Sequence, residues 1–176
     1  MDDSECLQLA LEFAKAKHKG QKRIGGDEYI THPIAVSEIV KGQGFDKNYQ
    51  ITALFHDLLE DTDATEDEIL EYGNEEILEA VKLLTKVKGY VMSEYIQAIK
   101  SNKIAVAVKT ADRLHNLQCA ITTSEEFKRK YILETVDWYL DFSADIRVAV
   151  KRLAESLKSP MAELSFLYEP IESWKK

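Results

Sequence analysis

Apolar residues recur along most of the chain with the spacing of an amphipathic helix. Leu7, Ala10, Leu11 and Ala14 are three and four positions apart, so a helix places them on one face. One run, residues 104–108, alternates in the manner of a strand. Because helical spacing continues in the residues that follow it, we predict a buried helix there as well. The pattern therefore predicts an all-α protein built as a helical bundle.

The chain has three prolines, Pro33, Pro160 and Pro170, and the 126 residues between the first two contain none. Proline disrupts the interior of a helix, whereas Leu, Ala, Glu and Lys, which fill this stretch, favour it. Pro33 suits the first position of a helix that ends at Gly42 and Gly44. The stretch between the prolines is thus free to form a series of helices.

Polar residues mark where further helices begin. Asp46 or Asn48 can cap a helix that we expect to run through residues 54–59. Two capping boxes, each a threonine followed three residues later by a glutamate, predict two more helix starts: Thr65 with Glu68, and Thr123 with Glu126. We expect the first of these to open a short helix ending at residues 72–73, and the second a long segment ending near residue 159.

No internal repeat, low-complexity linker or change of composition divides the chain. The sequence predicts one domain over residues 1–176, with a core at about residues 8–155 and a helical tail at about 160–176. Apolar residues make up 45% and charged residues 31% of the chain, which is ordinary for a soluble globular protein.

The composition also limits where the protein acts and what it binds. No apolar run approaches the roughly 20 residues of a membrane span, and the acidic N-terminus does not resemble a signal peptide. Two cysteines, Cys6 and Cys119, fit a reducing compartment, so we expect a cytoplasmic protein. The net charge of −8 argues against nucleic acid or a membrane as partner. It allows a small phosphorylated ligand, which responds to local charges and to a bound metal.

His56 and Asp57 are adjacent polar residues in an otherwise apolar segment. Neighbouring side chains on a helix diverge by about 100°, so both can reach one ion beside the axis. Imidazole together with carboxylate suits a divalent transition ion such as Mn, Fe or Zn. Taken alone, however, His56 is better explained as a hydrogen-bonded core histidine.

His32 and Asp112 can complete a set of two histidines and two aspartates. Such a set leaves coordination positions open for water and substrate, as a catalytic metal requires. Taken alone, Asp112 is better explained by a salt bridge to a nearby arginine. Spacing by itself cannot assemble residues that are 80 positions apart in the chain.

Glu60 and Asp61 lie four positions after His56 and Asp57, one helical turn further along. Acids in this position can polarise an attacking water or pass a proton to a leaving group. The alternative is a polar helix end, although acids are unfavourable near a helix C-terminus. Residues 60–79 carry ten acids and no base, and for most of them we predict a solvated helix face.

Lys109, Asp112, Arg113 and Asn116 share one stripe of a predicted helix. If Asp112 faces a metal, Asn116 lies one turn along, within reach of a ligand sugar or phosphate. For Arg113 we prefer a structural role as the ion-pair partner of an acid of this cluster.

In their order along the chain, His32, the pair His56–Asp57 and Asp112 resemble the H…HD…D pattern of the HD superfamily of metal-dependent phosphohydrolases. The surrounding segments resemble the hydrolase domain of RelA/SpoT proteins over about residues 8–155, and the short chain resembles a stand-alone small alarmone hydrolase. These segments are AKHKGQKR (16–23), YITHP (29–33), HDLLEDT (56–62), LTK (84–86) and KTADRLHN (109–116).

This resemblance implies removal of the 3′ diphosphate of guanosine tetra- or pentaphosphate, usually with Mn²⁺, although another divalent transition ion would suit the same ligands. It implies that two residues assist the water, Glu60 and Asp61. It implies that four residues hold the metal: His32, His56, Asp57 and Asp112.

The resemblance also implies that Arg23 stacks on the base and that Asn116 contacts the nucleotide, and we count Tyr29 and Lys109 as further substrate contacts. His18, also in a motif, is interpreted as packing or orienting its loop.

The chain departs from the family pattern at the nucleotide. Ile24 and Gly25 stand where the family commonly has lysine and serine, and Cys119 stands in place of a threonine. Two alternatives therefore remain. One is an HD phosphohydrolase that acts on a different nucleotide or phosphoester, and the other is a catalytically silent regulator that binds a nucleotide with the same fold.

Overall fold

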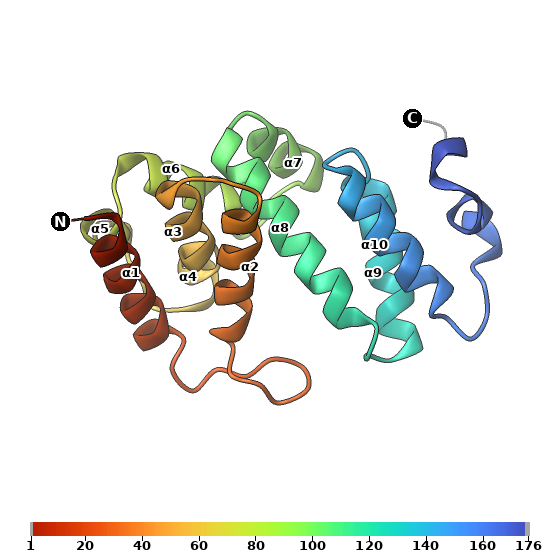
Figure 1. The fold of residues 1–176 in the computed structure, drawn as a ribbon, viewed down its shortest axis with the longest axis horizontal. Helices are drawn as coiled ribbons and strands as arrows, with labels where there is room; N and C mark the ends of the chain where they lie inside the picture. The colour runs from red at the N-terminus through yellow and green to blue at the C-terminus, as the bar shows by residue number, and fades with distance from the viewer. Residues whose placement is uncertain (1, 175–176) are drawn as a thin grey trace. The chain divides into compact units, whose positions relative to one another are not determined.

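The computed structural model describes residues 2–174, which are largely helical (Figure 1). These residues form no strand, and Lys22 and Glu28 make an isolated antiparallel bridge. The predicted all-α fold is confirmed. The elements are α1 (Asp3–Lys17), α2 (Thr31–Gly42), α3 (Lys47–Phe55), α4 (Leu58–Asp61), α5 (Glu66–Tyr72), α6 (Glu75–Leu84), α7 (Met92–Lys100), α8 (Lys103–Ala120), α9 (Glu125–Trp138), α10 (Ala144–Glu155) and the 3₁₀ segments η1 (Ala162–Tyr168) and η2 (Ile171–Ser173).

The chain divides into two compact units within α8, the first ending at Asp112 and the second beginning at Arg113. The single domain expected over residues 1–176 stays a prediction. The expected C-terminal helical tail contains two short 3₁₀ segments within residues 160–174, and its last two residues lie outside the described part of the chain. None of the described helices is long and apolar enough to cross a membrane.

The core of the first unit forms around α3. Figure 1 shows α3 and α4 between α1 and α2, and α3 contacts both of these helices. Residues Ile51–Phe55 of α3 are all buried. Phe55 meets Phe13 of α1 edge-on, with ring centroids 5.5 Å apart, and Phe13 stacks on Tyr72 of α5 at 4.3 Å. Because the end of α3 is enclosed in this way, the residues that follow it begin inside the protein.

The helix that we expected to run through residues 54–59 is interrupted. Asp46 caps α3 as predicted, with its side chain accepting a hydrogen bond from the Asn48 amide at 2.9 Å. However, α3 ends at Phe55, and α4 begins only at Leu58. At the break, Nδ1 of His56 lies 2.7 Å from the carbonyl oxygen of Ala53. A side chain that takes a helical carbonyl competes with the backbone for it, which opens the turn at this point.

Of the two capping boxes predicted from the sequence, the structure contains one. Thr65 and Glu68 form the predicted capping box of α5, which ends at Tyr72. The second predicted box is wrong, because Ser124 caps α9, accepting from the amide of residue 127 at 3.2 Å. Thr123 instead donates its hydroxyl to the Ala120 carbonyl at 2.6 Å.

Two further boundaries differ from the sequence prediction. The long segment that we expected to reach residue 159 is two helices, α9 and α10, and Ser143 caps the second. Pro33 is the third residue of α2 rather than the first. It is still within the first turn, where backbone amides have no helical partner, so its missing N–H costs nothing.

The second unit is organised around a buried arginine. Arg113 is 3% exposed, and its guanidinium carbon lies 4.3 Å and 4.0 Å from the ring centres of Tyr131 and Tyr139. It also donates to Glu134 of α9 at 2.7 Å. The predicted structural ion pair therefore exists, but its partner is not an acid of the metal-site cluster. Cation–π contacts with two tyrosines and one ion pair hold α9 and its C-cap residue Tyr139 to the second half of α8.

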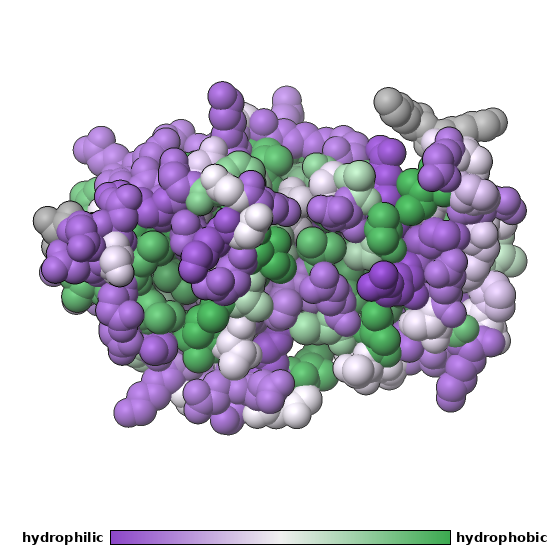
Figure 2. Space-filling model, viewed as in Figure 1, coloured by the Kyte–Doolittle hydropathy of each residue, from purple (hydrophilic) through white to green (hydrophobic). Residues whose placement is uncertain are grey.

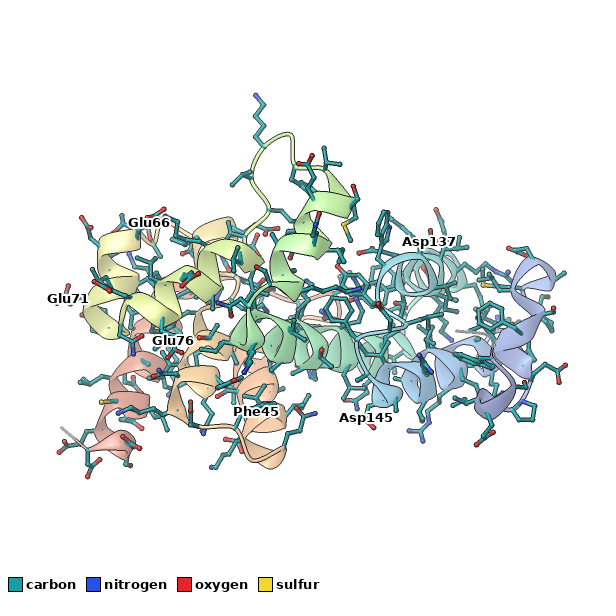
Figure 3. The ribbon with its side chains drawn as sticks, turned by 90° about the horizontal axis from the view of Figure 1, so that it is seen from above. Phe45, Glu66, Glu71, Glu76, Asp137 and Asp145 are labelled. Atoms are coloured by element: carbon teal, nitrogen blue, oxygen red, sulfur yellow. The ribbon has the colours of Figure 1, made fainter. Side chains whose placement is uncertain are left out.

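Polar residues cover most of the face drawn in Figure 2, with apolar patches between them. Glu66 and Glu71 lie at the outer edge of the view in Figure 3 and are exposed, as is Glu76. Glu66 pairs with Lys82 at 2.8 Å. Most of the acidic run is thus a solvated helix face, as predicted.

Candidate metal centre

Four polar side chains from separate parts of the first unit meet in its interior. His32 is the second residue of α2, and His56 and Asp57 form the break between α3 and α4. Asp112 comes from α8. His32, His56 and Asp112 are 1%, 3% and 6% exposed, and the Asp57 side chain is 20% exposed. The structure therefore brings together all four residues that the sequence analysis grouped.

The facing atoms of these residues are spaced as ligands of one ion would be. His32 Nε2 lies 3.0 Å from Asp112 Oδ1, and His56 Nε2 lies 3.0 Å from Asp57 Oδ2. The crosswise distances are 3.9 Å from His32 to Asp57 and 3.6 Å from His56 to Asp112. Two ligands about 2.1 Å from one ion lie about 3.0 Å apart at a right angle and about 4.2 Å apart when opposite. All four separations fall within this range.

The hydrogen bonds of His56 test whether a metal fits. Nδ1 is engaged with the Ala53 carbonyl, which fixes the ring and directs Nε2 into the cluster. Nε2 is buried and has no hydrogen-bond partner of acceptable geometry, although a carboxylate oxygen lies 3.0 Å away. The atom therefore faces the shared centre rather than a particular oxygen. Two imidazoles and two carboxylates arranged in this way fit a divalent transition ion.

The charges of the four clustered residues favour a cation between them. Burial alone would lower the pKa of His56, but Asp57 and Asp112 raise that pKa to about 10. Burial would raise the pKa of both carboxyls, yet His56 holds the Asp57 pKa below its usual value, and Lys109 with the two histidines does the same for Asp112. Burial lowers the pKa of His32, and Asp112 opposes this only in part. Without a metal, a proton on His56 supplies the positive charge.

Lys109 and Tyr29, which we predicted as substrate contacts, lie against the carboxylates of the cluster. Lys109 donates to Asp112 Oδ2 at 2.8 Å, while Oδ1 faces the histidines. The Tyr29 hydroxyl donates to Asp57 Oδ2 at 2.6 Å. Burial and the nearby Asp57 raise the pKa of Tyr29, so the phenol keeps its proton. The spacing of Lys109 and Asp112 in the chain was the one signal for the first contact. Nothing in the sequence indicated the second.

The two acids that we predicted to be catalytic lie beside the cluster on α4. Asp61 is exposed, and its Oδ2 lies 3.5 Å from the Tyr29 hydroxyl. Burial, then Asp57 and Glu60, raise the pKa of Asp61 above its usual value. Glu60 is also exposed, and it accepts a hydrogen bond from the backbone amide of Lys86 at 2.8 Å. The catalytic roles of both stay predictions.

The loop between α1 and α2 rests on the same cluster. His18 is 2% exposed, shares a hydrogen bond with the Gln21 side chain at 2.7 Å, and packs against the ring of Tyr29. Gln21 in turn donates to the Asp61 carbonyl at 2.7 Å. These contacts agree with the interpretation that His18 orients its loop. They add Gln21, which the sequence analysis did not single out.

Two further predicted substrate contacts, Arg23 and Asn116, are not among the residues of the cluster. The Arg23 guanidinium lies 6.0 Å from the centre of the Tyr29 ring, close to the cluster. Asn116 follows Asp112 by one turn of α8, but it belongs to the second unit. Its contact with a nucleotide stays a prediction.

The chain matches the HD domain family over residues 10–145. It belongs to this family. A guanosine-3′,5′-bis(diphosphate) 3′-pyrophosphohydrolase from Aquifex aeolicus is 34% identical over 98% of this chain, and a GTP pyrophosphokinase from Brucella melitensis is 33% identical over 96%. The chain spans only about a quarter of the length of these relatives, 25% and 23%. The resemblance to RelA/SpoT proteins that the motifs indicated is confirmed by these HD-family matches.

A solved structure agrees with the fold. It is a metazoan ortholog of SpoT, described as hydrolysing ppGpp, and it superposes with a TM-score of 0.68 at 23% identity. The match covers 85% of this chain and 94% of that chain. The HD domain fold is therefore shared. The family match and the cluster of His32, His56 and Asp57 carry the expectation of a divalent metal.

Metal content tests the centre directly. We expect the wild type, loaded with Mn²⁺ and desalted, to retain one ion per chain by elemental analysis, and His56→Ala and Asp57→Asn to retain far less. The reason is that each substitution removes one of four ligands, whereas changes beyond the ligands typically cost only about 10- to 100-fold in affinity. His115→Ala, on α8 in the second unit, is the matched control and should keep its metal. Equal metal in all variants would contradict the assignment.

Proposed function

We propose that this protein hydrolyses the 3′ diphosphate of guanosine 3′,5′-bis(diphosphate), using one Mn²⁺ ion held by His32, His56, Asp57 and Asp112. The observation that carries this proposal is the convergence of His32, His56 and Asp57, with Oδ1 of Asp112 3.0 Å from His32 and 3.6 Å from His56. Nε2 of His56 faces these carboxylates without forming a hydrogen bond. The names of the relatives support the substrate class. One is named for the hydrolase and another for the kinase, and the four-residue cluster lies within the quarter of their length that this chain matches.

A divalent ion in this centre would lower the pKa of a bound water and neutralise phosphate charge, which also reconciles a chain of net charge −8 with a polyanionic substrate. The surrounding side chains hold the geometry. Lys109 binds Oδ2 of Asp112, which leaves Oδ1 directed at the centre. Tyr29 donates to Oδ2 of Asp57, the oxygen that itself faces the histidines, and so orients that carboxylate.

Proton transfer falls to the acids of α4. In the proposed reaction, the oxygen of water bonds to the phosphorus attached to the 3′ oxygen, and that oxygen leaves and takes up a proton. Asp61 holds a proton more readily than an ordinary aspartate, because burial and the neighbouring Asp57 and Glu60 raise its pKa. This suits it to return a proton to the leaving oxygen, with Glu60 beside it.

The first alternative is a related phosphohydrolase with another nucleotide or phosphoester as substrate. A specific observation favours it, because Ile24 is 78% exposed beside Arg23, where the family commonly offers a lysine. The second alternative, a silent nucleotide-binding regulator, is disfavoured by the complete set of four ligands and by the presence of both acids on α4.

The proposed location is the cytoplasm, which agrees with the free thiols of Cys6 and Cys119. Neither nucleic acid nor a membrane is proposed as a partner.

A panel of nucleotides tests the substrate. The Mn²⁺-loaded protein is incubated with guanosine and adenosine 3′,5′-bis(diphosphates), with GTP and with a generic phosphodiester, and the products are separated by chromatography. We expect the guanosine compound to give GDP and pyrophosphate faster than any other member reacts. Faster cleavage of another member would establish the first alternative, and no cleavage of the guanosine compound at full metal loading would contradict the proposed reaction.

The acids of α4 are tested by neutral variants of the same shape. We expect Glu60→Gln and Asp61→Asn each to lower kcat by roughly 100- to 10,000-fold, the usual loss for an acid–base group, with metal content unchanged. Asp63→Asn, just beyond α4, serves as the control and should turn over normally. Normal turnover in either variant at full metal loading would remove that residue from the mechanism.

The Ile24→Lys variant tests whether the residues that differ from the family pattern in the loop after Arg23 weaken substrate binding. A restored hydrogen bond to a charged group is worth about 1.5–3 kcal/mol, so we expect KM for the guanosine compound to fall roughly 10- to 150-fold with kcat little changed. Gly25 is left unchanged because its φ of +109° would strain a serine. Ile24→Met is the control, and equal KM values for the two variants would refute the prediction.

A further inference from the structure

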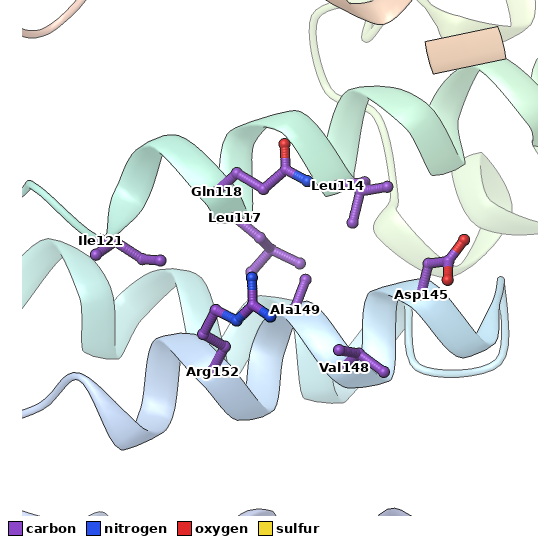
Figure 4. Close-up of a pocket in the computed structure, with 8 residues that line it drawn as sticks. All are labelled: Leu114, Leu117, Gln118, Ile121, Asp145, Val148, Ala149 and Arg152. Carbon is purple, nitrogen blue, oxygen red and sulfur yellow. The ribbon is translucent and has the colours of Figure 1, made fainter. Parts of the chain in front are cut away.

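A groove of about 320 Å³ runs between α8 and α10 in the second unit (Figure 4). Leu114 and Ile121 of α8 line one side, and Val148 of α10 lines the other. Ile121 is 36% and Val148 46% exposed, which is high for side chains of this size. The groove therefore presents apolar surface that the unit itself leaves open.

The groove belongs to the second unit alone. All of its lining residues lie after Arg113, whereas the four candidate metal ligands belong to the first unit.

Two opposite charges stand at the ends of the groove. Figure 4 shows Asp145 toward the Leu114 end and Arg152 toward the Ile121 end. Both side chains are exposed, and neither makes an ion pair or side-chain hydrogen bond with any residue between 2 and 174. They are seven residues apart on α10, about 10.5 Å along the axis, which is too far for them to pair with each other.

The exposed strip of α10 is complementary to itself. Asp145, Val148, Ala149 and Arg152 follow one another at intervals of three, one and three residues, so they share one helical face. A two-fold axis between Val148 and Ala149 reverses this order. It sets Asp145 opposite a second Arg152 and Val148 opposite a second Ala149. The larger Val148 side chain then packs against the small Ala149, and the negative Asp145 faces the positive Arg152.

We propose that this face binds a second copy of the chain in a two-fold dimer, with Asp145 of each copy paired to Arg152 of the other. Self-complementarity is what a two-fold interface requires, because the same patch serves both partners. Each copy brings the exposed Val148 toward the apolar groove of the other. The proposal is independent of the hydrolase reaction.

Charge exchange tests the dimer by sedimentation velocity over a range of concentrations. We expect the wild type to dimerise, and Asp145→Arg and Arg152→Asp each to raise the dimer Kd about tenfold or more, because each creates two like-charge contacts. The double variant carries both reversals and should dimerise like the wild type. An equimolar mixture of the two single variants should also dimerise, since one carries two positive charges and the other two negative.

Lys158→Asp, which changes the charge by the same amount as Arg152→Asp but outside the groove, is the control and should leave the Kd unchanged. Asp145→Asn and Arg152→Gln keep the test valid if a reversal disturbs α10, and each should weaken the dimer less than the reversal does. A wild type that stays monomeric at all concentrations would overturn the proposal, as would a double variant or a mixture that fails to restore the dimer.

Discussion

The first unit depends on one electrostatic constraint: four polar side chains, three of them buried and Asp57 partly so, must share a positive charge. Asp112 illustrates it, with Oδ1 3.0 Å from His32 and Oδ2 2.8 Å from Lys109. Carboxylates are costly to bury without a partner, so α2, α8 and the end of α3 must all converge on this point for the core to form. The break after Phe55 belongs to the same arrangement, because the His56 ring takes the Ala53 carbonyl that would otherwise continue the helix.

The two halves of α8 show how one helix serves two purposes. Asp112 faces the polar cluster, while the next residue, Arg113, is enclosed by two tyrosines and an ion pair to Glu134. Both side chains are buried and charged, and each has its counter-charges supplied by neighbouring side chains. The strong packing around Arg113 explains why this charged residue has a structural role, although it stands within a motif.

Helix class and two of the three predicted capping residues were confirmed, since both depend on local spacing. Asp46 and Thr65 are examples, and Thr123 fails because the adjacent Ser124 offers the same chemistry one position later. The break at His56 could not be predicted, because it depends on a side-chain contact within an apolar stretch. The four clustered residues followed from the resemblance, but the contact of Tyr29 with Asp57 depends on how the loop before α2 folds back, and spacing carries no sign of it.

The most direct test of the account is the position of the ion itself. Crystals of the protein soaked in Mn²⁺ and measured at the manganese absorption edge would locate it by anomalous scattering. The account predicts one peak in the first unit, about 2.0–2.3 Å from four atoms: His32 Nε2, His56 Nε2, Asp57 Oδ2 and Asp112 Oδ1. A fully loaded crystal with the peak elsewhere, and these four side chains bonded only to one another, would contradict it.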